Sequence, residues 1–202
     1  MVALALIIGI ILGIVIAFIR VLKVPVLTPI TTVYISFIRS TPEIIQLFLV
    51  YFGVPVITEA LFHINLDSVD AINYAIIAFG LNQSAFLAEL FRGGLEAVPR
   101  GQYEAAFADG LTVWQTFRRV IIPQAVRIIL PGFGIEVIAL FQGTSIASTI
   151  GVTDMMGKAA ALGIATYHSL EAYTSAALVF VVMSIVLELL FRHLSKKYSY
   201  ER

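Results

Sequence analysis

Polar side chains that could bind a solute interrupt two of the long apolar stretches of this 202-residue chain. One group follows Leu81 and a second starts within residues 128–145: Asn82, Gln83, Ser84, Glu136, Gln142, Thr144 and Ser145. Amides and hydroxyls donate and accept hydrogen bonds, and a carboxylate adds a negative charge. Polar groups are costly at membrane depth, so each is a candidate binding residue if these stretches cross a membrane.

These polar groups also have a structural interpretation, because amides and hydroxyls hydrogen-bond neighbouring helices to each other. For Asn82, Gln83 and Ser84 the two interpretations fit the sequence equally well, and for Gln142 and Thr144 the structural one stays open. The chain contains no cysteine, and its three histidines are scattered. We therefore expect neither a catalytic residue nor a metal site.

A second segment with unusual chemistry, residues 100–120, is polar in a chain that is otherwise mostly apolar. Its first half predicts a short amphipathic helix that contains Glu104 and ends at Gly110, since glycine tolerates the left-handed backbone past a last turn. One surface of this helix consists of small residues, Ala105, Ala106 and Ala108. Small residues let another surface approach closely, which favours a helix that docks on a partner protein. The alternative is a solvated loop between two spanning helices.

The composition indicates an integral membrane protein. Hydrophobic residues make up 59% of the chain and charged residues 13%, against about 45–50% and about 25% in soluble domains. About 20 apolar residues cross the roughly 30 Å hydrocarbon layer as a helix. We expect one all-α domain, residues 1–202, with five membrane-spanning helices at about residues 2–20, 42–57, 70–88, 121–141 and 172–191. Residues 143–163 are small and polar for membrane depth, which indicates broken helices.

The basic residues predict the orientation in the membrane. In the five-helix arrangement, twelve of the 13 Lys and Arg residues, Arg202 included, fall on one side, and Lys158 is the exception. The loop before the third span, which includes Asp67, has no basic residue. Because cytoplasmic loops are rich in Lys and Arg, we expect residues 100–120 and the C-terminus in the cytoplasm and the N-terminus outside. The net charge of zero offers no argument for nucleic acid as a partner.

Six short motifs, in order, resemble those of one family. The sequence Glu104-Ala105-Ala106, then Gly110, then Val120-x-Ile122-Pro123 resembles the EAA loop of ABC-transporter inner-membrane permeases. Further motifs resemble the polar-amino-acid branch of that family: Arg39-Ser40-Thr41-Pro42 with Gln46-Leu47, Leu81 to Glu89 with Arg92-Gly93, Gly101-Gln102, Pro123-Gln124-Ala125 and Thr144-Ser145. The resemblance runs from about Arg39 to about Ile150 and covers over half of the chain.

The resemblance implies a five-helix, type I ABC importer permease of the bacterial cell membrane. Such a permease pairs with a second permease subunit, identical or homologous, and receives its substrate from an extracytoplasmic amino-acid-binding protein. Separate ATPase subunits hold ATP and Mg and would dock on the residues that match the EAA motif: Glu104, Ala105, Ala106, Gly110, Val120, Ile122 and Pro123. The chain itself lacks a Walker A motif, since its one Gly-Lys pair, Gly157-Lys158, is followed by Ala159. Hydrolysis on the partner would drive alternating access.

The resemblance also implies an amino-acid substrate, which carries an ammonium and a carboxylate. Gln142, Thr144, Ser145 and Glu136 could supply the donors and the negative charge that such a molecule needs. Where the family usually has Lys-Asp-Thr-Ser, this chain has Gln142-Gly143-Thr144-Ser145. The missing aspartate removes an anion that would favour a cationic side chain. We therefore expect a substrate that is not strongly cationic, although Glu136 leaves that question open.

Two other functions stay open at this point. An ion-coupled secondary amino-acid transporter or channel would account for the polar residues at membrane depth. It leaves residues 100–120 without a role, however, and five spans without a visible inverted repeat fit it poorly. A membrane scaffold subunit that transports nothing would account for the docking helix alone. Transport that persists without ATP would favour the first, and a copurifying ATPase indifferent to every solute would favour the second.

Overall fold

The computed structural model describes residues 1–66 and 68–198, with side chains up to Lys197. Asp67 and Arg202, which enter the predicted orientation, lie outside the described residues. Regular structure in the described ranges is entirely helical, as the sequence predicts. The α-helices are α1 (Val2–Val21), α2 (Leu27–Ser40), α3 (Glu43–Phe48), α4 (Val54–Phe62), α5 (Ala71–Glu96), α6 (Arg100–Ala108), α7 (Val113–Thr116), α8 (Ile122–Gly143), α9 (Met155–Thr166) and α10 (Ser169–Tyr198). Two π-helical turns, Leu49–Gly53 and Phe117–Ile121, join α3 to α4 and α7 to α8.

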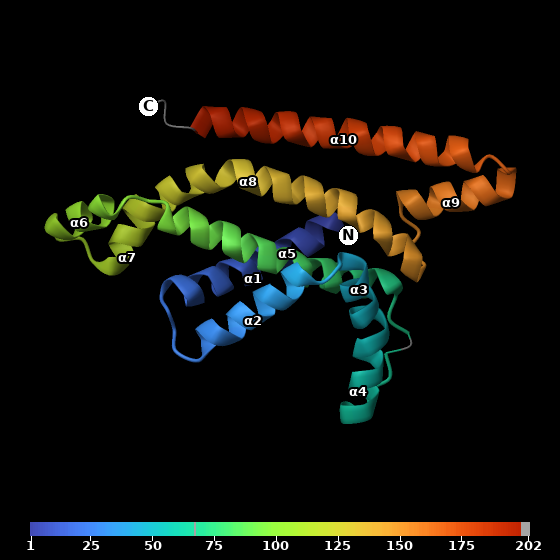
Figure 1. Ribbon diagram of the computed structural model, residues 1–202, viewed down its shortest axis with the longest axis horizontal. Coiled ribbons are helices and arrows are strands. Elements are labelled where there is room, and N and C mark those ends of the chain that lie inside the picture. Colours follow the sequence, from blue (N-terminus) through green and yellow to red (C-terminus); the bar gives the residue numbers. More distant parts are fainter. Residues whose placement is uncertain (67, 199–202) are drawn as a thin grey trace.

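Five helical segments of the described chain are long and apolar enough to cross a membrane: Val2–Val21, Glu43–Phe62, Ala71–Glu96, Val113–Ile150 and Ser169–Lys197. This number confirms the predicted all-α membrane architecture. The helices α1, α5, α8 and α10 run along the long axis of the molecule, whereas α3 and α4 turn away from it (Figure 1). Because α4 has no buried residue, the second segment joins the bundle through α3 and the π-helical turn Leu49–Gly53, both of which contact α5.

The most extensive helix contact joins α1 and α5. Small residues of α1 recur at every fourth position and are buried there: Ala5, Gly9, Gly13 and Ala17. A Cβ atom added to Gly9 would lie 2.9 Å from Cβ of Gln83, and one added to Gly13 would lie 3.0 Å from Cβ of Leu87. Small residues at this spacing let two helix backbones approach closely. The contact holds α5 at the centre of the bundle, with 61% of its most apolar stretch buried, against 6% for α10.

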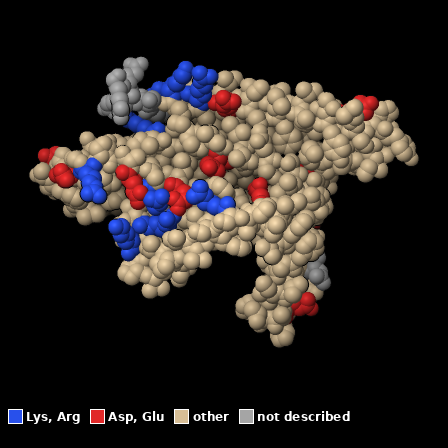
Figure 2. Space-filling model, in the orientation of Figure 1, with Lys and Arg blue, Asp and Glu red and all other residues tan. Residues whose placement is uncertain are grey.

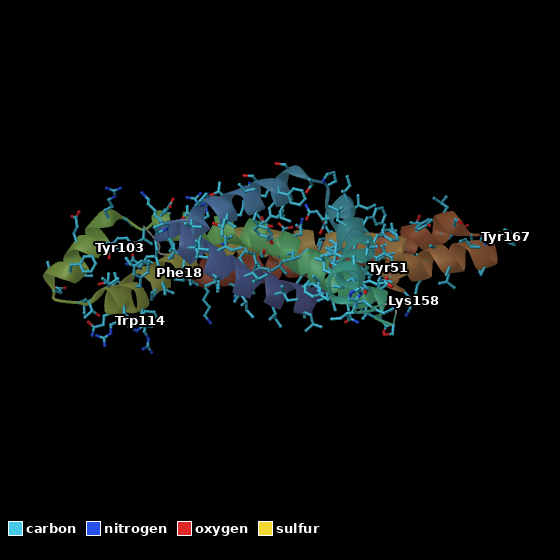
Figure 3. The ribbon with its side chains drawn as sticks, turned by 90° about the horizontal axis from the view of Figure 1, so that it is seen from below. Phe18, Tyr51, Tyr103, Trp114, Lys158 and Tyr167 are labelled. Carbon is cyan, nitrogen blue, oxygen red and sulfur yellow. The ribbon has the colours of Figure 1, made fainter. Side chains whose placement is uncertain are left out.

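The predicted break after α8 is present. A 3₁₀ helix, Thr144–Ile150, continues α8, and Gly151 then takes a positive φ of 85°, which turns the chain toward α9. The helix α9 packs beside α10 at the end of the molecule opposite α6 (Figure 1). Lys158 and Tyr167 lie at this end, far from Tyr103 and Trp114 at the other (Figure 3).

Candidate functional site

Asn82, on α5, is part of a buried chain of amide hydrogen bonds. Its Nδ2 donates to Oε1 of Gln46 at 3.0 Å. Nε2 of Gln46 in turn donates to the carbonyl oxygen of Ile38 at 2.7 Å and to Oγ1 of Thr41 at 2.8 Å. Asn82 and Gln46 are both buried. These bonds join α5 to α3 and satisfy a carbonyl near the end of α2, where no intrahelical donor is available.

Ser84, which is buried, faces the half-buried Tyr34 of α2. The Tyr34 hydroxyl donates to the carbonyl oxygen of Leu81 at 2.9 Å and lies 2.7 Å from Oγ of Ser84. Oγ of Ser84 also donates to that carbonyl at 2.8 Å. We call Tyr34, Gln46, Asn82 and Ser84 the closed polar network, because each of their side chains is paired within the chain. Its geometry favours the structural interpretation for Asn82 and Ser84.

Gln83 and Glu136 form a much looser contact on the next face of α5. Nε2 of Gln83 lies 3.5 Å from both the carbonyl oxygen and the carboxylate Oε2 of Glu136. These distances are at the limit of a hydrogen bond, and one amide is shared between two acceptors. The Glu136 side chain is half-buried. Its carboxylate therefore keeps most of its capacity to accept hydrogen bonds from another molecule.

A carboxylate that the sequence analysis did not consider, that of Glu43 at the start of α3, lies against α8. A Cβ atom added to Gly143 would lie 2.7 Å from Oε2 of Glu43 and 3.1 Å from Oε1. Gly143 and Glu136 are seven residues apart, two helical turns, so they share one face of α8. We call Glu43, Gln83 and Glu136 the open polar face. Figure 2 shows acidic atoms near the apolar middle of the molecule, with basic atoms beside them.

The remaining predicted binding residues make contacts elsewhere. Nε2 of Gln142 donates to Oγ of Ser184 on α10 at 3.0 Å. The buried hydroxyl of Thr144 donates back to the carbonyl of Phe141 at 2.8 Å. The Ser145 side chain is half-buried, and its carbonyl accepts from Ser148. Among the seven predicted residues, the structure therefore brings only Gln83 and Glu136 into side-chain contact with each other across two helices.

The predicted docking helix is α6. It ends at Ala108, and Gly110 follows with a positive φ of 76°, the backbone that glycine adopts without strain. Glu104 and Ala105 are exposed, and in the described residues Glu104 has no hydrogen bond or ion pair. Ala106, in contrast, is buried. The expectation of one surface containing Ala105, Ala106 and Ala108 is therefore wrong, because successive residues turn by about 100° on a helix.

An apolar cluster anchors α6 to the membrane helices. Leu95, Val98, Ile121 and Ala125 form its buried centre, and Val21, Tyr103, Phe117, Val120 and Ile129 pack around it. The Tyr103 ring lies 6.0 Å from that of Phe117 at 75°, an edge-on contact, and its hydroxyl donates to the carbonyl of Leu95 at 3.4 Å. Burial, and then the charge of Glu96, raises the pKa of the Tyr103 phenol, so the hydroxyl stays protonated as a donor. Val120 thus belongs to the anchor, and Ile122 beside it is half-buried at the start of α8, while Pro123 is exposed.

The second half of the segment exposes large side chains. Thr112 caps α7 with a capping box, accepting from the backbone of Gln115 at 3.3 Å and donating to its side chain at 2.9 Å. Val113 and Trp114 then follow in exposed positions, with Trp114 68% exposed at the edge of the molecule (Figure 3). An exposed tryptophan and valine in the same segment as the exposed carboxylate of Glu104 are typical of a surface that binds another protein.

Charged residues gather around this end of the bundle. Arg20 of α1 forms an ion pair with Glu89 of α5, and Arg92 pairs with Glu89 and Glu96 at 2.6 Å each. Figure 2 shows the Lys and Arg side chains of the visible face toward the end that carries α6 and α7. This distribution agrees with the asymmetry from which the orientation is predicted.

Comparison with known proteins identifies the family. The family described as "binding-protein-dependent transport system inner membrane component" matches residues 9–200. The chain belongs to this family. The permease is 37% identical over 194 residues to the L-cystine transport system permease protein TcyL of Bacillus subtilis (strain 168), over 96% of this chain and 81% of that relative. It is 37% identical over 182 residues to the probable amino-acid ABC transporter permease protein PatM of Vibrio harveyi, over 90% of this chain and 79% of that relative.

Solved structures agree with this assignment. An amino acid ABC transporter with histidines superposes on the permease with a TM-score of 0.85 at 33% identity, over 97% of this chain and 88% of that one. The inward-facing MetNI methionine ABC transporter, 17% identical, superposes with a TM-score of 0.77 over 98% of this chain and 93% of that one, which shows a shared fold. The predicted resemblance and the five-helix importer-permease fold are confirmed, and the permease is a multi-pass membrane protein.

Three residues of the permease escaped the sequence analysis. Tyr34 and Gln46 are the partners of Ser84 and Asn82. Gln46 lies in one of the family motifs, but no local pattern predicts either pairing, because the paired residues are far apart in the chain. Glu43 did carry a signal. It is an acidic residue at the start of an apolar stretch long enough to cross a membrane, and an ionisable residue in such a stretch is a candidate by default.

Proposed function

We propose that the permease is the transmembrane subunit of an ABC importer that moves an amino acid delivered by an extracytoplasmic binding protein. Relatives named as cystine and amino-acid permeases support the substrate class. The chain has no Walker A motif, which supports separate ATPase subunits that bind ATP and Mg. The observation that carries the proposal is the exposed α6–α7 surface, anchored by one apolar cluster to α5 and α8.

This apolar cluster would transmit movement from the ATPase to the helices that bind the substrate. Tyr103 and Val120 link the docking segment to Leu95 on α5 and Ala125 on α8. The same two helices carry Gln83 and Glu136, whose contact at 3.5 Å is weak enough to break and re-form. Movement of α6 would therefore shift α5 against α8 and open or close the face on which the substrate binds.

A second permease subunit, identical or homologous, would complete the pathway. The helix α4 has no buried residue, and its Val56, Leu61 and Phe62 are more than half exposed. Surfaces of this kind are covered either by lipid or by another transmembrane helix. In the complex, α6 and the C-terminal end of α10 lie in the cytoplasm, and α9 lies outside, where the binding protein would arrive.

The test is a charge reversal in the docking helix. Glu104→Lys places a cation on a surface that would otherwise present a carboxylate to the ATPase. We expect amino-acid uptake and binding-protein-stimulated ATP hydrolysis in proteoliposomes to fall at least about tenfold, which corresponds to about 1.4 kcal/mol. The variant should still insert and fold, because the Glu104 side chain is exposed and has no hydrogen bond or ion pair in the described residues.

Glu59→Lys is the matched control, since Glu59 is exposed on α4 at a distance from α6. Gly110→Val is a second variant, because a β-branched residue is strained at the φ of 76° that Gly110 adopts. Normal coupled hydrolysis in Glu104→Lys and Gly110→Val would contradict the docking assignment. Uptake that continues without ATP would instead indicate a secondary transporter, and hydrolysis unaffected by any solute would indicate a scaffold.

A further inference from the structure

Glu43 is a negative charge in the membrane that has no partner in the described part of the chain. Its carboxylate makes no hydrogen bond or ion pair there, although the side chain is half-buried between α3 and α8. The residue opens the apolar segment Glu43–Phe62. An ionisable group in such a position is expensive and usually marks the path of an ion or substrate.

Gly143 makes room for this carboxylate. Even a methyl group at position 143 would come within 2.7 Å of Oε2 of Glu43. The expectation that the substrate is not cationic rested on the absence of an acidic side chain at position 143. The structure removes that premise, because the space beside Gly143 holds the carboxylate of Glu43.

The open polar face thus has two carboxylates that form no ion pair in the described residues. Glu136 lies two turns before Gly143 on the same face of α8, about 10 Å along the helix axis. Gln83 contacts Glu136 without cancelling its charge. The guanidinium of Arg39 acts on Glu136 through its charge, but it lies over the Phe86 ring, 5.6 Å from its centroid, and forms no ion pair with either glutamate in the described residues. One carboxylate is enough for the α-ammonium of an amino acid, so the second is available for another cation.

We propose that Glu43 determines specificity by binding the positively charged end of the substrate's side chain, while Glu136 binds its α-ammonium. The substrate class is then a long basic amino acid, of the lysine or arginine kind. This inference rests on the proposed function, since it assigns a ligand to the face that the amino acid would cross. A long side chain can reach from one carboxylate to the other, and a short neutral one leaves Glu43 unpaired.

The experiment is competitive uptake by the whole importer in proteoliposomes, with the same binding protein for every variant. Labelled lysine and glutamine compete, because glutamine is neutral and of comparable length. We expect the wild type to prefer lysine, and Glu43→Gln to lower the lysine-to-glutamine ratio at least about tenfold, or about 1.4 kcal/mol. Glu43→Asp should keep part of the preference, and Glu59→Gln, which removes an exposed charge further along the same segment, should keep all of it.

Gly143→Ala supplies a second variant in case Glu43→Gln fails to assemble. It displaces the carboxylate without changing the charge, and it should lower the ratio in the same direction. A wild type that prefers glutamine, or an unchanged ratio in the variants that assemble, would overturn the inference while leaving ATP-driven uptake intact. Absence of ATP-dependent uptake for every amino acid would overturn the proposed function instead, so the two failures are distinguishable.

Discussion

Adjacent residues of α5 belong to two polar regions with opposite properties. Asn82 and Ser84 lie in the closed polar network, where each side chain has a partner between 2.7 and 3.0 Å away. Gln83, between them, faces Glu136 at 3.5 Å, on a face where Glu43 has no partner within the described chain. Both regions are polar at membrane depth. What separates them is whether the chain itself satisfies the polar groups, and this decides which of them can bind a solute.

The comparison has an energetic consequence. A buried donor or acceptor that loses its partner costs about 1–3 kcal/mol, whereas a typical paired hydrogen bond contributes only about 0.5–1.5 kcal/mol. Mutations in the closed polar network should therefore lower stability. Mutations on the open polar face should alter transport at nearly constant stability.

The largest effect on stability is expected for Asn82→Leu. The change leaves the buried Oε1 of Gln46 without its donor and should destabilise the permease by about 2–3 kcal/mol. Thermal unfolding of the purified complex in detergent measures this as a lower Tm. Gln142→Leu is the matched control, since it also removes an amide hydrogen bond, but from the exposed contact with Ser184 on α10. Equal Tm values for the two variants would contradict the assignment of Asn82 to a structural role.

A smaller energetic effect, seen in transport alone, is expected for Glu136→Gln. Glutamine keeps the size and the hydrogen-bonding capacity of the side chain and removes only the charge that would bind the substrate's ammonium. Uptake should fall about tenfold, or about 1.4 kcal/mol, with the Tm close to that of the wild type. If the Tm falls as far as in Asn82→Leu while uptake by the remaining folded protein is normal, Glu136 has a structural role like that of the closed polar network.

Local patterns predict much of the fold. Apolar stretches of about 20 residues locate the spans, and Gly110 locates the end of α6 because its φ is positive. The ends of two helices differ from the prediction, because residues that often interrupt a helix or follow an apolar stretch are also compatible with a longer helix. The second span was expected to finish near residue 57 and to be interrupted late by Gly53 and Pro55, yet the helix continues to Phe62. Pro55 lies in the first turn of α4, where its missing N–H is no loss.

The third helix also continues past its predicted end. It was expected to leave the membrane near residue 88, and α5 runs on to Glu96. The ion pairs of Arg92 with Glu89 and Glu96, at i,i+3 and i,i+4 spacing, support a helix beyond the apolar stretch. Side-chain partners such as Gln46 for Asn82, or Gly143 for Glu43, were not predictable, because only the folded chain brings these distant segments together.

The most direct test compares the water accessibility of the open polar face with that of the closed polar network. Because the chain contains no cysteine, single substitutions Glu136→Cys and Ser84→Cys each introduce one thiol. The assembled importer is treated with a membrane-impermeant thiol reagent in the absence of nucleotide, with and without the transported amino acid. We predict that the thiol at position 136 reacts and that the amino acid slows its reaction, while the thiol at position 84 stays unmodified. Equal reactivity at the two positions, or reaction at position 84 with none at position 136, would contradict the division into an open and a closed polar region.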